Sequence, residues 1–238
     1  MKLKYSMLIN ITLLIALVFV VFKSGFHNSV INRLKSKPNP ENIFHNTWEY
    51  KHETALYKQY TKQANVVMLG NSITYRANWN ELLNRNDIVN RGIGNDITKG
   101  MLNRLEDVYS INPKICFVMG GINDLLKGIE SEIIASNIES IIIQLKSNNI
   151  KPIISSVLYT AKSYTNHKKI NYRILKTNEL IKEVCLKHNV KFINLNASLS
   201  YNNTLKEAYS FDGIHLSALG YNKWKEVLIP IIYQEFNH

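Results

Sequence analysis

NVVMLGNSIT, residues 65–74, is a short apolar run that passes directly into a small polar loop. The run is apolar at successive positions, which is typical of a strand covered by helices on both faces of a sheet. The loop places Ser72 immediately after that strand. In parallel sheets the working side chains gather beyond the carboxyl ends of the strands. The stretch therefore predicts an α/β protein in which Ser72 lies at the edge where functional sites form.

The same alternation continues along the chain. Further apolar runs rich in Val and Ile predict strands, and longer segments with i, i+3, i+4 apolar spacing predict the helices between them. The predicted strands are 65–69, 87–90, 114–119, 151–158 and 191–195, and the predicted helices are 98–110, 131–148, 168–188 and 217–236. This order predicts right-handed crossovers and a mostly parallel five-stranded sheet in a three-layer αβα sandwich of the flavodoxin-like type.

The loops that follow these strands share one kind of composition. GIGND at 92–96 follows the second predicted strand, and GGIND at 120–124 follows the third. DGIH at 212–215 comes after the fifth strand and a loop. A serine, permissive turns, an Asn amide and an Asp-x-x-His pair thus meet at one edge of one sheet. That convergence is the functional signal of the sequence.

The residue types at this edge suit nucleophilic attack on an ester. The hydroxyl of Ser72 is a poor nucleophile at neutral pH and needs a base, for which His215 is the candidate. Asp212 can fix the tautomer of His215 and stabilise its protonated ring. The attack creates an oxyanion, which requires preorganised donors. The candidate donors are the backbone N–H of Ser72, a backbone N–H in the 94–95 turn and the side-chain amide of Asn123.

Four blocks of this chain resemble, in order, those of the SGNH hydrolases, also called GDSL-like esterases. They are GNSIT at 70–74, NRGIGNDIT at 90–98, GIND at 121–124 and DGIHLSALGY at 212–221. The resemblance covers about residues 64–236 and is strongest to the branch with platelet-activating-factor acetylhydrolase subunits and carbohydrate acetylesterases. It implies a nucleophilic Ser72, triad partners Asp212 and His215, and an oxyanion donor in Asn123. It also implies a serine esterase for short-chain, mainly acetyl, esters, with O-acetyl groups on carbohydrate as the expected substrate.

Two positions depart from the family pattern. Asn71 stands where an Asp is usual, which matters little if that side chain orients the loop. Aligning the second block on Asp96 places Asn95, and not a Gly, at the position whose backbone N–H donates to the oxyanion. Asn tolerates left-handed backbone geometry better than other non-glycine residues, so we predict that the donor survives. An alignment shifted by one residue makes Gly94 the donor instead.

Several neighbouring residues are expected to support the site. Asp96 and Asp124 are predicted to cap the helices that follow them. Asn90 and Arg91 are expected to brace the loops. The segment 159–172 is predicted to be a loop that extends toward the site and selects the alcohol part of the substrate.

The N-terminal region predicts export. Residues 7–22 are apolar except for Asn10 and Thr12, and lysines flank the run. Its length lies between a signal peptide core and a comfortable membrane span. Because no small-residue cleavage site follows it, we expect an uncleaved anchor with the body outside the cytoplasm, or a secreted protein if the segment is cleaved. The expected organisation is 1–23 anchor or signal peptide, 24–63 linker and lead-in helix, and 64–238 catalytic domain.

Composition excludes several other classes of protein. Of 238 residues, 45% are apolar and 20% charged, which is typical of a globular chain. The net charge of +11 includes +6 from residues 1–40, so the body is only mildly basic and a nucleic-acid partner is not expected. Cys116 and Cys185 form no C-x-x-C pair and are expected to be buried thiols. No motif predicts a metal or an organic cofactor.

Other functions remain open at this stage. Within the same chemistry, the chain could be a lysophospholipase, a thioesterase or an O-acyltransferase. From a different class, it could be a non-catalytic binding module that keeps an inactive site. The sequence leaves the acyl group, the alcohol and the oligomeric state undetermined.

Overall fold

The computed structural model describes residues 23, 47–60 and 62–236. The chain divides into two compact units, residues 1–43 and 44–238, and the sheet lies in the second. The predicted anchor and linker fall outside the described residues, apart from Lys23. Within the described part of the chain, no helix combines the length and the apolar character needed to cross a bilayer.

Five parallel strands form the central sheet, as the alternation of elements predicted. Their order in the sheet is β2-β1-β3-β4-β5. They are β1 (Val66–Gly70), β2 (Ile88–Gly92), β3 (Ile115–Met119), β4 (Lys151–Ser155) and β5 (Lys191–Ile193). Every residue of β1 and β3 is buried, which explains why these runs are apolar on both faces. The strand order reverses beside β1, so the loops after β1 and β3 meet at the switch point where sites of such sheets form.

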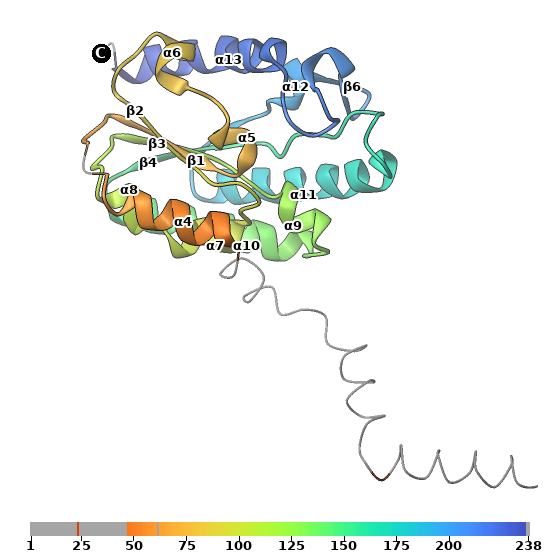
Figure 1. Ribbon diagram of the computed structural model, residues 1–238, viewed down its shortest axis with the longest axis horizontal. Helices are drawn as coiled ribbons and strands as arrows, with labels where there is room; N and C mark the ends of the chain where they lie inside the picture. The colour runs from red at the N-terminus through yellow and green to blue at the C-terminus, as the bar shows by residue number, and fades with distance from the viewer. Residues whose placement is uncertain (1–22, 24–46, 61, 237–238) are drawn as a thin grey trace, which may run out of the picture. The chain divides into compact units, whose positions relative to one another are not determined.

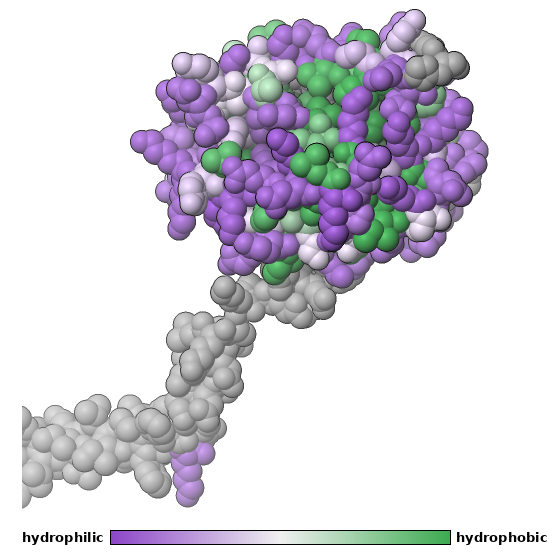
Figure 2. All heavy atoms as spheres, turned by 180° about the vertical axis from the view of Figure 1, so that it is seen from behind, coloured by the Kyte–Doolittle hydropathy of each residue, from purple (hydrophilic) through white to green (hydrophobic). Residues whose placement is uncertain are grey.

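Helices cover both faces of the sheet, which confirms the three-layer sandwich (Figure 1). One layer contains α6 (Trp79–Leu83), α12 (Asn196–Leu199) and α13 (Ala218–Phe236). The other contains α4 (Trp48–Tyr57), α7 (Thr98–Asn103), α8 (Glu106–Tyr109), α10 (Ser131–Ser147) and α11 (His167–Lys187). Figure 2 shows a face on which hydrophilic residues surround smaller groups of exposed hydrophobic ones, as is usual for a protein surface.

Short elements occupy the loops between these layers. They are α5 (Ser72–Tyr75), α9 (Ile122–Leu126), the antiparallel pair β6 (Ser200–Tyr201) and β7 (Thr204–Leu205), and the 3-10 helix η1 (Glu207–Tyr209). The sequence pattern did not predict them, because elements of two to five residues are too short to show a period. Two of them, α5 and α9, begin directly after β1 and β3 and carry residues of the site.

Several predicted elements differ from the observed ones in extent, and three of these differences have a clear structural reason. The predicted helix 98–110 is interrupted, because Arg104 leaves helical geometry and its side chain is buried. The predicted strand 151–158 ends at Ser155, since the backbone N–H of Val157 is bound by the side chain of Asn178 and not by another strand. The predicted loop 159–172 ends early, because α11 already begins at His167.

Candidate active site

Ser72 is the first residue of α5 and is separated from β1 by Asn71 alone. Asn71 caps this helix, with its side-chain Oδ1 accepting a hydrogen bond from the backbone N–H of Ile73 at 3.0 Å. An Asn therefore performs the orienting task for which the family usually has an Asp. Helix α5 lies very close to β2: a Cβ added at Gly92 would be 2.3 Å from the backbone nitrogen of Tyr75. A side chain at position 92 would displace the serine helix.

Asn90 holds the other end of that helix. Its Nδ2 lies 3.0 to 3.1 Å from the carbonyl oxygens of Thr74 and Tyr75, at the end of the helix, and of Ala77 just beyond it. Its Oδ1 accepts from the backbone N–H of Gly92 at 2.8 Å. Asn90 thus braces the loop after β1 from the neighbouring strand, as predicted.

The structure brings Ser72, His215 and Asp212 together. Ser72 Oγ lies 2.9 Å from His215 Nε2, and His215 Nδ1 lies 2.6 Å from Asp212 Oδ2. The other carboxylate oxygen, Asp212 Oδ1, accepts from the backbone N–H groups of His215 at 2.7 Å and Ile214 at 3.0 Å. The three-residue spacing therefore folds into a closed turn that fixes both the carboxylate and the ring.

The loop that carries this pair is stabilised by a serine. Ser210 Oγ donates to the carbonyl oxygen of His215 at 2.8 Å and accepts from the backbone N–H of Gly213 at 2.8 Å. Gly213 has φ +89°, a conformation that L side chains rarely adopt. The carbonyl of Gly213 accepts from the backbone N–H of Ala161 at 2.8 Å, so the segment after β4 supports the loop. The phenyl ring of Phe211 stacks on the His215 ring, with centroids 5.9 Å apart.

The environment of Asp212 favours its ionised form. Partial burial on its own would raise the pKa of Asp212, but the hydrogen bond from the His215 ring and those from the backbone of His215 and Ile214 outweigh it. The pKa of this carboxyl is therefore lower than usual. The group facing His215 Nδ1 is a carboxylate, which selects the ring tautomer whose Nε2 can accept a proton from Ser72.

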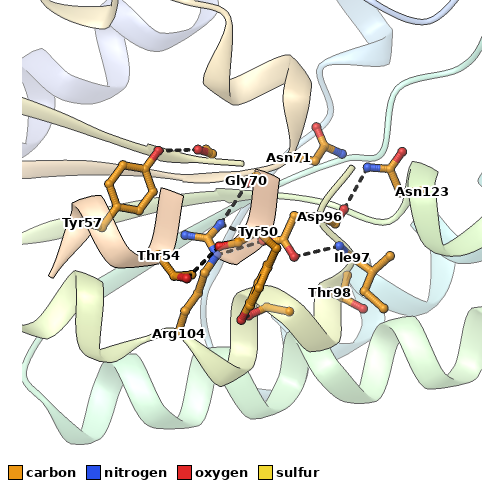
Figure 3. Close-up of polar contacts among 12 residues, drawn as sticks. Tyr50, Thr54, Tyr57, Gly70, Asn71, Asp96, Ile97, Thr98, Arg104 and Asn123 are labelled. Atoms are coloured by element: carbon orange, nitrogen blue, oxygen red, sulfur yellow. Dashed lines mark hydrogen bonds and ion pairs between the residues drawn. The ribbon is translucent and has the colours of Figure 1, made fainter. Parts of the chain in front are cut away.

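Asn123, on α9 after β3, is oriented by a backbone carbonyl. Its Nδ2 donates to the carbonyl oxygen of Asp96 at 2.8 Å (Figure 3). A side-chain amide carries two N–H donors, so this contact fixes the amide while leaving the second N–H for a ligand. Asn95 has φ +59°, in the left-handed region that the sequence predicted it to tolerate. Whether Asn95 or Gly94 supplies the backbone donor stays a prediction.

A buried ion pair lies next to the loop at 92–96, which contains the candidate backbone donors and is called the oxyanion loop below (Figure 3). Arg104 Nε donates to Asp96 Oδ2 at 2.9 Å, and Arg104 Nη2 donates to the carbonyl oxygen of Gly70 at 3.1 Å. This guanidinium joins the end of β1 to the residue whose carbonyl orients Asn123. Burial outweighs the nearby guanidinium and raises the pKa of Asp96 to about 6.

The two predicted capping carboxylates act at one helix. Asp96 Oδ1 accepts from the backbone N–H of Ile97, just before α7. Asp124 accepts from the backbone N–H of Thr98 at 3.0 and 3.1 Å and from its hydroxyl at 2.5 Å. The prediction that Asp124 caps the helix following it is therefore wrong: it lies within α9 and caps α7, because the loops after β2 and β3 are adjacent. Burial raises the pKa of Asp124 to about 6.

Sequence reasoning missed two residues at this site. In the predicted helix 98–110, Arg104 shares an apolar face with Met101, Leu105 and Val108. A charged residue on such a face was a signal that its side chain is buried. Glu49 contacts the second block from α4, and nothing in the local sequence indicated this contact.

A protein family and several known proteins resemble this chain. A family model described as the GDSL-like Lipase/Acylhydrolase family matches residues 68–223. Among curated proteins, the chain is 26% identical over 172 residues to an N-acylneuraminate cytidylyltransferase of Streptococcus agalactiae, covering 70% of this chain but only 40% of that protein. It is 26% identical over 198 residues to the platelet-activating factor acetylhydrolase IB subunit alpha1 of Bos taurus, covering 78% of this chain and 83% of that protein.

Solved structures share the fold. A GDSL-like lipase from Bacteroides thetaiotaomicron superposes with a TM-score of 0.69 at 24% identity, covering 79% of this chain and 98% of its own. A variant of a Geobacillus acetyl-xylooligosaccharide esterase superposes with a TM-score of 0.59 at 18% identity, covering 74% and 96%.

Proposed function

The chain belongs to the family of GDSL-like lipases and acylhydrolases, which hydrolyse ester bonds, and from this premise we propose that it is a serine esterase removing acetyl groups from carbohydrate hydroxyls. The observation that carries the proposal is the continuous hydrogen-bonded chain from Ser72 through His215 to Asp212, with separations of 2.9 and 2.6 Å. A nucleophile, a base and an orienting carboxylate in that order constitute the machinery of acyl transfer through serine.

The first half of the reaction forms an acyl-enzyme. His215 Nε2 accepts the proton of Ser72 Oγ as that oxygen attacks the ester carbonyl carbon, and the carbonyl oxygen becomes an oxyanion. The oxyanion collapses, the bond to the alcohol oxygen breaks, and the alcohol leaves with the proton from His215. The acyl group is then bound to Ser72.

The second half returns the enzyme to its starting state. His215 accepts a proton from water, whose oxygen attacks the acyl carbon, and the tetrahedral species collapses by expelling Ser72 Oγ, which regains its proton from His215. Asp212 stabilises the protonated ring in both halves. Its lowered pKa suits this role, since the carboxylate stays ionised through the cycle.

The oxyanion requires donors placed where its charge develops. We assign this role to the backbone N–H of Ser72, a backbone N–H of the 94–95 turn and the side-chain amide of Asn123. The carbonyl of Asp96 holds the Asn123 amide in place before substrate arrives. Such preorganisation means that the donors need not reorient during the reaction.

The relatives support the choice of acyl group and alcohol. The curated mammalian relative is named as an acetylhydrolase, and the chain covers 83% of its length. One protein with the same fold is named as an acetyl-xylooligosaccharide esterase. Both names refer to acetyl groups, and the second refers to a sugar alcohol.

The proposal is tested with the purified full-length chain on p-nitrophenyl acetate, butyrate and octanoate, beside Ser72→Ala and His215→Ala. We expect turnover that falls steeply with acyl length and disappears in both variants. The same proteins are then given an acetylated xylo-oligosaccharide, and released acetate is measured.

Each other outcome has a defined meaning. Highest activity on octanoate would favour a lysophospholipase or thioesterase. Acetyl transfer to an added sugar, with little free acetate, would favour an O-acyltransferase. Equal inactivity of the wild type and both variants on every ester would contradict the esterase proposal and leave the binding module.

We further propose that residues 7–22 tether the body to the outer side of a membrane. The support is the run of residues 7–22, apolar except for Asn10 and Thr12, with flanking lysines in the sequence. Full-length protein is expected in the membrane fraction and to be cut by protease added to intact cells, whereas a variant lacking residues 7–22 stays inside. A shortened form in the medium would show that the segment is cleaved.

A further inference from the structure

Helix α4 lies before the part of the chain that the family model matches, yet it contacts the loops of the site. Tyr50 OH donates to the carbonyl oxygen of Gly100 at 3.2 Å, and Tyr57 OH donates to that of Gly92 (Figure 3). Both rings are buried. The helix is therefore fixed against the second sequence block, residues 90–98, on the side of the sheet that α7 covers.

One carboxylate on this helix reaches the oxyanion loop itself. Glu49 Oε2 accepts a hydrogen bond from Asn95 Nδ2 at 2.7 Å. A Cβ added at Gly94 would lie 3.0 Å from both carboxylate oxygens of Glu49. The carboxylate thus lies against both residues whose backbone N–H groups are candidates for the oxyanion donor.

The conformation of Asn95 explains why such a contact matters. Its φ of +59° is less favourable for a residue with a side chain than for glycine, which occupies this region freely. A relaxation of this residue toward negative φ would rotate the adjacent peptide planes and so change the direction of their N–H groups. An oxyanion donor stabilises the transition state only when it is already aimed at the developing charge.

We infer that Glu49 is a positioning residue for the oxyanion donor of the 94–95 turn. It holds the side chain of Asn95 and so keeps the backbone in the left-handed conformation that a glycine would reach without help. The inference rests on the proposed esterase function. It assigns a role in the reaction to the lead-in helix, which lies outside the four sequence blocks.

The test compares full-length variants on p-nitrophenyl acetate. Glu49→Ala removes the acceptor, whereas Glu49→Gln keeps an oxygen that can accept from Asn95 Nδ2 and removes only the charge. Asn95→Gly removes the need for support. Glu53→Ala is the matched control, because Glu53 lies one turn further along α4 and accepts from Tyr75 OH at 3.2 Å without contacting Asn95.

We expect Glu49→Ala to lower kcat about tenfold with KM within about twofold, a smaller loss than the 10²- to 10³-fold typical of deleting a donor. Glu49→Gln should retain kcat within about threefold, and so should Glu53→Ala. In an Asn95→Gly background, Glu49→Ala should change kcat less than twofold, because glycine needs no anchor. An equal loss in both backgrounds would overturn the inference, since Glu49 would then act by another route.

A second measurement does not depend on activity. Hydrogen–deuterium exchange of the peptide covering residues 92–98 should accelerate in Glu49→Ala and remain unchanged in Glu53→Ala. Unchanged exchange in Glu49→Ala would overturn the inference whatever the ester assay shows. If Ser72→Ala and wild type are equally inactive while the exchange result holds, the esterase proposal fails and the support of the loop by Glu49 stands.

Discussion

At the scale of single residues, asparagine performs four different tasks at this site. Asn71 caps the serine helix, Asn90 binds carbonyls at its end, Asn95 adopts a left-handed turn, and Asn123, bound to the carbonyl of Asp96, is the proposed side-chain donor to the oxyanion. An amide can donate and accept at once and carries no charge. At position 123 a carboxylate could not donate to an oxyanion, and it would add negative charge beside the developing one.

Removal of the Asn123 amide should affect the transition state and not the ground state. We expect Asn123→Ala to lower kcat by about 10²- to 10³-fold with little change in KM, the usual result of losing an oxyanion donor. The measurement is steady-state kinetics on p-nitrophenyl acetate, with thermal unfolding as a check of folding. Asn137→Ala is the control, since its amide donates to Thr98 Oγ1 at 3.0 Å and is not proposed to bind the oxyanion. Full activity of Asn123→Ala would show that this amide does not bind the oxyanion.

At the scale of elements, prediction succeeded where burial on both faces dictated the pattern. The strands β1 and β3 are short, yet their apolar runs identified them because every side chain is covered by a helix layer. The predicted ends of elements were wrong where a side chain took the hydrogen bond that a backbone group would otherwise have made. The Asn178 side chain takes the N–H of Val157, and the buried pairing of Arg104 ends α7. These contacts join distant segments, so no local period could reveal them.

The Asp124 carboxylate should give the protein a measurable pH dependence of stability. Its pKa is raised from the ordinary 3.8 to about 6 by burial, so between these values the folded chain keeps a proton that the unfolded chain has released. This group therefore makes the free energy of unfolding decrease as pH rises through that window, by no more than about 3 kcal/mol. Asp124→Asn cannot titrate and should lose less stability than wild type from pH 4 to 7 in urea unfolding.

A second carboxyl provides a control of opposite sign. Hydrogen bonds from Arg85 lower the pKa of Asp87 in the folded chain. The stability that Asp87 contributes is therefore present at pH values above its pKa in the unfolded chain, and it is lost as the pH falls through the folded-state pKa. Asp87→Asn should therefore lose less stability than wild type on acidification. Parallel pH profiles for wild type and Asp124→Asn would contradict the raised pKa.

At the scale of the whole molecule, the sheet topology assembles the site from distant parts of the chain. Ser72 and Asn123 lie on the short helices that follow the neighbouring strands β1 and β3, whereas His215 comes from a loop beyond β5. The sequence predicted that these residues share one edge of the sheet. It could not show how the last loop returns to that edge, because the support it receives from Ala161 depends on the packed segment after β4.

The two cysteines offer a probe of global unfolding. Cys116 and Cys185 are free and buried, as predicted, and burial raises the pKa of both thiols, that of Cys185 to about 12. A buried thiol with a raised pKa yields little thiolate, the form that reacts. We expect no reaction with Ellman's reagent in native buffer and two reactive thiols in denaturant. Rapid modification in the native protein would indicate local opening around β3 for Cys116 or around α11 for Cys185.

The 143 positions that separate Ser72 from His215 also impose an order in time. At the usual pace of about 5 to 20 residues per second, a ribosome adds the base roughly 7 to 30 seconds after the nucleophile. A nascent chain that already carries the serine helix and the oxyanion loop therefore has no base to activate the serine. A product that terminates before His215 lacks the proposed base and is therefore expected to be inactive.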